Sequence, residues 1–163
     1  MRRSLPLFCA IAVGVLAACA TPATTATPAT TNGTVRKIVN ASVHVTIRAA
    51  LNVLSDQGVN LRLTDEDAGR VETEYFDVTT FQQEAQNYPV AERSIRMTFQ
   101  IHPDTLGRGS IVLIATVYQP YRVGVEGSRR GEHLVPSDHP GATYTKKILA
   151  KIEEAALGLE RGN

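Results

Sequence analysis

Residues 94–102 of this 163-residue chain read SIRMTFQIH, and polar and apolar side chains alternate at every position. Successive side chains of a β-strand point to opposite faces, so this period of two predicts a strand with one buried face and one exposed face. The predicted buried positions are Ile95, Met97, Phe99 and Ile101. The first constraint on the fold is therefore a sheet that has at least one covered face.

Other segments favour strands as well. Residues 59–64 and 69–78 both alternate, and residues 34–39 can form a short lead-in strand. The predicted inward face of residues 59–64 consists of Val59, Leu61 and Leu63. We expect these segments to join the same sheet.

The segment SIVLIATVYQPY, residues 110–121, is apolar on both faces between Ile111 and Val117. This pattern is typical of a central strand that is covered on both sides. If one of these faces is instead exposed, it forms an apolar patch that can serve a partner.

Two segments have the helical period. One apolar stripe runs from Val43 to Leu54, with Asn40 or Ser42 as its cap and Gly58 just past its end. A second stripe consists of Ile148, Leu149, Ile152, Ala155, Ala156 and Leu159, with Pro140 at the first helical position and Asp138 as a nearby cap. The expected class is α+β: an antiparallel sheet of at least four strands, packed by an N-terminal and a C-terminal helix in two layers.

The acidic segment LTDEDAGRVETEYFDV, residues 63–78, lies between two predicted strands. A helix–loop–helix calcium site requires oxygen ligands at loop positions 1, 3 and 5, glycine at 6 and glutamate at 12. Counted from Asp65, position 5 is Gly69, position 6 is Arg70 and position 12 is Phe76. The segment therefore favours a hairpin turn, and we expect Glu72 and Glu74 to lie on a solvated face.

The N-terminus resembles a bacterial lipoprotein signal. Two arginines precede an uncharged apolar run, which ends in Leu16-Ala17-Ala18-Cys19. By this resemblance residues 1–18 are a signal peptide and Cys19 is acylated. Residues 19–34, rich in Ala, Thr and Pro, then form a disordered tether, and residues 35–163 form one domain. The alternative is an ordinary secretory signal with an incidental cysteine.

Ala20 follows the cysteine where inner-membrane lipoproteins usually carry aspartate. The resemblance therefore implies a lipid anchor in the outer membrane and a domain on its periplasmic face, assuming a Gram-negative host.

The second cysteine, Cys9, lies within the signal, so the mature domain has neither a disulfide nor a thiolate nucleophile. The 17 basic and 16 acidic residues are nearly balanced, which gives no support for nucleic-acid binding.

The helix that leads into residues 59–78 resembles the repeated unit of BamC-type lipoproteins, accessory components of the outer-membrane barrel assembly machinery. The matching residues are Asp67, Gly69, Val71, Thr73 and Tyr75. The resemblance implies a helix-grip fold, in which a curved antiparallel sheet grips a helix. This chain holds one such domain, and it lacks the family's long partner-binding N-terminal segment.

The sequence offers little for catalysis. There is no Gly-x-Ser-x-Gly elbow and no phosphate-binding glycine loop. His133 and His139 share a long loop, residues 122–140, with Glu132 and Asp138, and these four could converge on a divalent metal. Their spacing matches no common ligand pair, so we expect no metal centre and no cofactor.

Three functions from different classes are consistent with the sequence. The favoured one is a non-catalytic accessory lipoprotein that docks an envelope protein through its sheet or long loop. The second is a module that binds a lipid, peptide or glycan between sheet and helix, in a cavity lined by Met97, Phe99 and Leu113. The third is a metal-dependent enzyme at His133 and His139.

Overall fold

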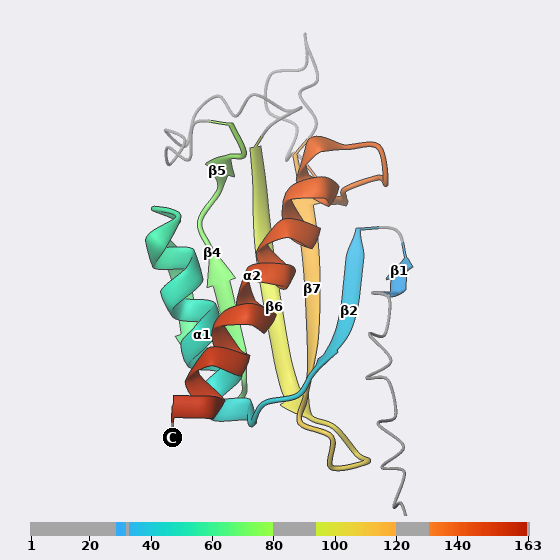
Figure 1. The fold of residues 1–163 in the computed structure, drawn as a ribbon. Helices are drawn as coiled ribbons and strands as arrows, with labels where there is room; N and C mark the ends of the chain where they lie inside the picture. The colour runs from blue at the N-terminus through green and yellow to red at the C-terminus, as the bar shows by residue number, and fades with distance from the viewer. Residues whose placement is uncertain (1–28, 32, 80–93, 120–130, 163) are drawn as a thin grey trace, which may run out of the picture.

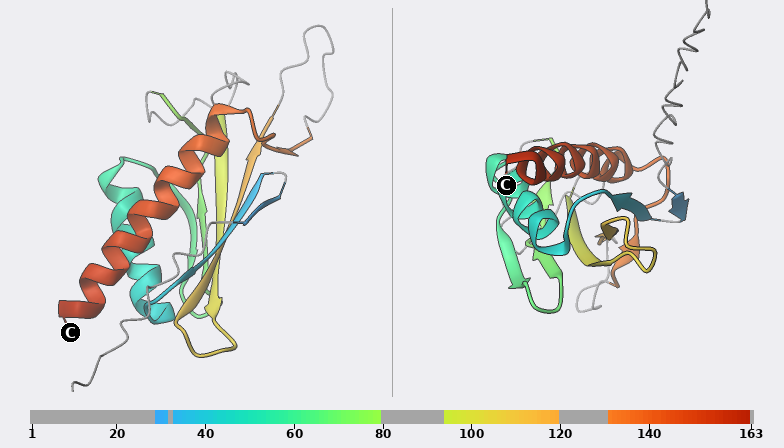
Figure 2. Two further views of the ribbon diagram at one scale, coloured as in Figure 1. Left: turned by 45° about the vertical axis from the view of Figure 1, so that its right-hand side comes forward. Right: turned by 60° about the horizontal axis from the view of Figure 1, so that its bottom comes forward.

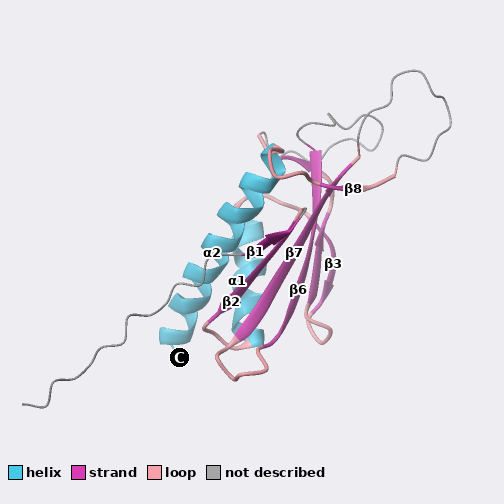
Figure 3. Ribbon diagram, turned by 90° about the vertical axis from the view of Figure 1, so that its right-hand side faces the viewer, coloured by secondary structure: helices cyan, strands magenta, loops and turns pink. Residues whose placement is uncertain are grey.

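The computed structural model describes residues 29–31, 33–79, 94–119 and 131–162. Figure 1 shows two helices, α1 (Val43–Asp56) and α2 (Pro140–Gly162), in front of one antiparallel sheet. Figures 2 and 3 show that both helices lie on the same side of the strands. The predicted two-layer α+β class is confirmed, and the arrangement is compatible with a helix-grip-like sandwich. No helix in the described ranges is long and apolar enough to cross a membrane.

Most strand pairs of the sheet join neighbours in sequence, whereas β2 pairs with β7 and β4 pairs with β6. Its strand order is β1-β2-β7-β6-β4-β3, with β5 paired to β6 and β8 paired to β7, all antiparallel. The strands are β1 (Ala29–Thr31), β2 (Thr34–Val39), β3 (Leu61–Asp65), β4 (Arg70–Thr73), β5 (Phe76–Asp77), β6 (Ser94–Pro103), β7 (Ser110–Tyr118) and β8 (His133–Leu134). The predicted strand at 94–102 is therefore central, between β7 and β4.

The helix ends follow from local chemistry. Ser42 caps α1, because its hydroxyl accepts a hydrogen bond from the backbone N–H of Val45. Gly58 follows with φ of +69°, the left-handed conformation predicted for it. At α2, Pro140 occupies the first helical position, but His139 rather than Asp138 acts as the cap, since its Nδ1 accepts a hydrogen bond from Gly141 N–H.

The core lies between the helices and the inner face of the sheet. Met97, Phe99, Val112 and Ile114 have no exposed area there and pack with the apolar stripes of both helices. Burying side chains of this size contributes roughly 1.5–3 kcal/mol each. Phe76 meets Tyr144 of α2 edge to face, with ring centroids 5.6 Å apart.

An ion pair also joins the two layers. Lys37 of β2 pairs with Glu153 of α2, and both side chains are largely covered. The hydroxyls of Thr46 and Ser110 are 2.8 Å apart in the core, so α1 and β7 are linked by a buried hydrogen bond. These four side chains thus have polar partners, as buried polar groups generally require.

The structure differs from the sequence-based expectations at the sheet edges. Every residue of β3 is exposed, including Leu61 and Leu63, because β3 is the last strand of the sheet and its pairing with β4 is irregular between those two residues. The range 19–34, for which we predicted a tether, contributes β1 to the opposite edge. Part of the predicted 122–140 loop forms β8.

Some expectations lie outside the described residues. They are the signal peptide at 1–18, the acylation of Cys19 and most of the tether. The first part of the predicted long loop, residues 122–130, also lies there.

Candidate functional site

The face of the sheet opposite the helices carries an apolar row along β7. Val112, Ile114 and Thr116 point into the core, so the alternate residues face outward. These outward residues are Ile111, Leu113, Ala115 and Val117, all half-buried. The prediction of a central strand covered on both sides is wrong for the described elements, because both helices pack on one side (Figure 3).

Neighbouring strands extend this row. Ile38 of β2 pairs with Ile111, and Leu134 of β8, which is 47% exposed, pairs with Val117. We call this surface the open face, defined as Ile38, Ile111, Leu113, Ala115, Val117 and Leu134. Apolar side chains that gather on one face of a sheet mark interaction sites more often than scattered exposed residues do.

Polar residues of β4, β6 and β2 border the apolar row of the open face. Arg70 forms an ion pair with Glu72, which is 7% exposed, so the expectation that Glu72 lies on a solvated face is wrong. Gln100 and Arg36 flank Leu113 on either side in the sheet register. An apolar centre with a polar rim is the usual anatomy of a docking surface.

The acidic segment forms the predicted turn. Asp65 ends β3, and its side chain accepts a hydrogen bond from Ala68 N–H at 3.0 Å. Asp67 is exposed, and Gly69 has φ of +63°. The carboxylates therefore stabilise the turn and keep it in water.

The remaining motif residues have structural roles. A Cβ on Gly69 would lie 2.1 Å from the carbonyl oxygen of Ile101, so only glycine fits against β6. Val71 and Thr73 are fully buried, and Tyr75 is half-exposed beyond the end of β4. The motif thus fixes how the hairpin packs on the sheet.

Tyr75 belongs to a polar cluster near the start of β6. Its hydroxyl donates a hydrogen bond to Glu132 Oε1 at 2.8 Å, while Arg96 donates to Glu132 Oε2 at 2.6 Å. The Arg96 guanidinium also lies over the Tyr75 ring, 5.7 Å from its centroid. Burial, followed by the hydrogen bond to Glu132, raises the pKa of Tyr75 well above its ordinary value. This cluster fastens the segment before β8 to the sheet.

The two candidate metal ligands lie on the ring of Tyr118. The ring centroids of His139 and His133 are 4.9 Å and 6.2 Å from that of Tyr118. The hydrogen bonds described above already engage His139 Nδ1 and Glu132. Within the described residues no group of three or more His, Cys, Asp or Glu side chains could hold a metal ion. The structure therefore brings the histidines together around an aromatic ring.

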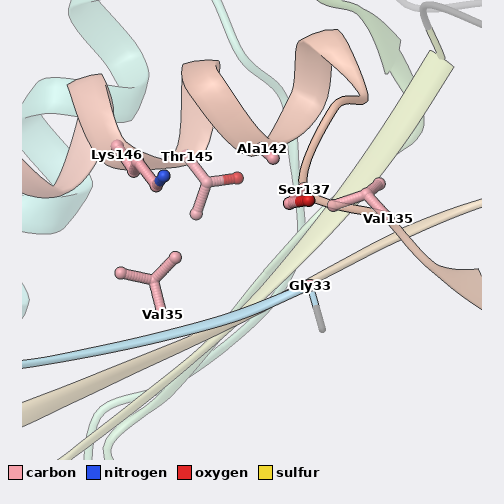
Figure 4. Close-up of a pocket in the computed structure, with 7 residues that line it drawn as sticks. All are labelled: Gly33, Val35, Val135, Ser137, Ala142, Thr145 and Lys146. Carbon is pink, nitrogen blue, oxygen red and sulfur yellow. The ribbon is translucent and has the colours of Figure 1, made fainter. Parts of the chain in front are cut away.

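The cavity of Met97, Phe99 and Leu113, which would favour the binding-module function, does not form. Met97 and Phe99 face the core, whereas Leu113 belongs to the open face, so the three cannot line one cavity. A different hollow of about 310 Å³ lies between β2 and the start of α2 (Figure 4). It is lined by Gly33, Val35, Val135, Ser137, Ala142, Thr145 and Lys146.

Several of these residues carry no signal in the sequence. Arg96 is one polar position in an alternating strand, and Ser137 and Lys146 occur in polar stretches without a motif. Long-range pairing brings them to their sites, and periodicity reports only local structure. No protein-family model and no curated protein matches this chain.

Proposed function

We propose that the chain is a non-catalytic accessory lipoprotein of the bacterial envelope, which docks another envelope protein through the open face. The lipobox-like sequence that ends at Cys19 supports a lipid anchor. The Ala- and Thr-rich residues that follow support a short tether to the outer membrane. An anchored domain of this kind meets partners close to the bilayer.

The single observation that carries the proposal is the one-sided sheet. Both helices cover the inner face, while the outward row of β7 keeps Ile111, Leu113 and Val117 partly exposed. Leaving such residues in contact with water costs about 25 cal/mol for each Å² of apolar area that a partner could cover. A docking role explains why strand β7 is apolar on both faces.

The proposal is tested by site-specific crosslinking in envelope membranes. A photo-crosslinking amino acid replaces Leu113 on the open face or, as a matched control, Arg48 on the exposed side of α1. We expect one discrete adduct with an envelope protein from position 113 and none from position 48.

The anchor is tested in the same experiment. Cys19→Ser removes the acylation site, and we expect the adduct from position 113 to decrease at least about tenfold, because the local concentration is lost. Equal adducts from positions 113 and 48, or no adduct from either, would contradict docking through the open face. An unchanged adduct in Cys19→Ser would contradict the role of the anchor.

A further inference from the structure

The hollow between β2 and α2 lies on the helix side of the sheet, so it is separate from the open face. Figure 4 shows Val35 rising from β2 toward Thr145 and Lys146 of α2, with Ser137 and Val135 at the other end. Its volume of about 310 Å³ lies at the lower end of the range for ligand pockets.

The floor of the hollow is apolar. Val35, Val135 and Ala142 are buried hydrophobic residues. The hydroxyl of Thr145 is engaged elsewhere, since it donates to Gly141 O and lies 2.7 Å from the hydroxyl of Thr116. Figure 4 shows the Thr145 methyl group pointing toward Val35, so this side chain adds apolar surface to the floor.

The wall beside Gly33 is rigid. A Cβ at Gly33 would lie 2.8 Å from both Leu134 Cβ and Val135 N, and the φ of Gly33 is +74°. The carbonyl of Gly33 accepts a hydrogen bond from Thr116 N–H, and Val135 N–H donates to Thr116 O. Because Thr116 holds both segments, the hollow is formed before any ligand arrives.

The rim carries one positive charge. Lys146 lines the hollow and is exposed, and none of the ion pairs among the described residues includes it. Glu153, further along α2, is paired with Lys37. The Lys146 ammonium can therefore donate to an anionic group, with the Ser137 hydroxyl as a second polar contact.

We propose that this hollow binds a small amphipathic anion: a short apolar body on the floor of Val35, Val135 and Ala142, with a carboxylate or phosphate at Lys146. An apolar floor with a few polar groups placed at its rim resembles the composition of a small-molecule site. This inference does not depend on docking through the open face.

The test titrates octanoate into the full chain carrying Cys19→Ser, so that no lipid anchor competes. Backbone NMR shifts report on Val35, Val135 and Thr145. Two matched lysine variants separate an effect of the site from an effect of overall charge. Lys146→Ala removes the rim charge, and Lys147→Ala removes another exposed charge that does not line the hollow. Octanol and inorganic phosphate serve as the apolar and anionic halves of the ligand.

We expect saturable shifts at the lining residues with octanoate, weakened at least about tenfold by Lys146→Ala and less than about twofold by Lys147→Ala. Octanol should bind at least about tenfold more weakly than octanoate. Saturable binding of inorganic phosphate that requires Lys146 would support a headgroup or a free phosphate as the anionic part. The proposal would be overturned if neither octanoate nor phosphate gave a saturable shift. It would also be overturned if octanol bound as tightly as octanoate, or if the two lysine variants weakened binding equally.

Discussion

The hydroxyl of Thr73 accepts a hydrogen bond from the backbone N–H of Met97 at 3.0 Å, in the buried interior of the sheet. The ladder between β4 and β6 ends at the pair Glu72 and Thr98, and β5 resumes pairing at Phe76 and Ile95. Between these points a side chain takes the place of a backbone carbonyl. This contact explains why the strand motif carries a threonine at a fully buried position.

Replacing Thr73 with valine should destabilise the protein by about 1–3 kcal/mol, because valine keeps the shape but leaves the Met97 N–H unsatisfied. Thr98→Val, on the outer face of β6, is the matched control and should change the free energy of unfolding by less than about 0.5 kcal/mol. Urea unfolding of both variants measures the difference. Equal effects would contradict the role assigned to the hydroxyl.

Two glycines with similar backbone angles separate conformational strain from steric contact. Gly69 has φ of +63° and contacts Ile101, whereas Gly107 has φ of +68° with no atom within 4 Å of its would-be Cβ. Gly107→Ala should cost about 1–2 kcal/mol from backbone strain alone. Gly69→Ala should cost clearly more, because the β3–β4 hairpin must also move away from β6. Denaturation midpoints measure both losses of stability. A loss in Gly107→Ala as large as that in Gly69→Ala, or larger, would contradict the contact between Gly69 and Ile101.

Much of the fold could be predicted from local periodicity. The alternation at 94–102 gave a strand, the stripes after Ser42 and Pro140 gave two helices, and the acidic turn followed from Asp65 and Gly69. These features depend on neighbours in sequence, for which pattern and capping chemistry are sufficient.

The rest depends on contacts between distant residues. Glu132 and Tyr75 are 57 positions apart in the sequence, and no local pattern predicts their hydrogen bond. Alternation in β3 indicated a buried face, but Leu61 and Leu63 are exposed because the strand lies at the edge of the sheet. The apolar sequence of β7 suits a strand covered on one face or on both, and only the placement of the helices decides between them.

His139 offers a way to distinguish a helix cap from a metal ligand. Its Nδ1 accepts the Gly141 N–H at 2.9 Å. Asparagine can accept the same hydrogen bond, so His139→Asn should retain most of the stability, while His139→Ala should lose about 0.5–2 kcal/mol. Thermal unfolding without and with added Zn²⁺ measures both effects. Stabilisation of the unmutated chain by Zn²⁺ that both substitutions abolish would instead indicate a metal site.

Alkaline pH should destabilise the fold through the buried tyrosine Tyr144. Burial raises the pKa of Tyr144 to about 12, whereas in the unfolded chain it titrates near the ordinary value of 10.0. Between these values the unfolded chain releases a proton that the folded chain retains, so stability is complete below about pH 10 and falls as the pH rises toward 12. Tyr144→Phe should make the unfolding free energy less dependent on pH in this window. An unchanged pH dependence would contradict this assignment.

The open face predicts a separation between stability and docking. Leu113 is half-buried with Gln100 and Arg36 on either side, so Leu113→Glu places a carboxylate beside a guanidinium and outside the core. We expect the denaturation midpoint to change little. We also expect the envelope-protein adduct, formed from a photo-crosslinker at Ala115, to be lost, because a partner would have to desolvate the new charge.

Leu106→Glu is the matched control for that variant. Leu106 is 71% exposed in the turn between β6 and β7, away from the outward row of β7, so the adduct should persist when it carries a charge. Loss of the adduct in both variants would indicate a general effect of the added charge. Retention of the adduct in Leu113→Glu would show that the partner does not dock on the open face. Unfolding of Leu113→Glu would show that this side of β7 is covered within the molecule, and the one-sided sheet could then no longer support the proposed function.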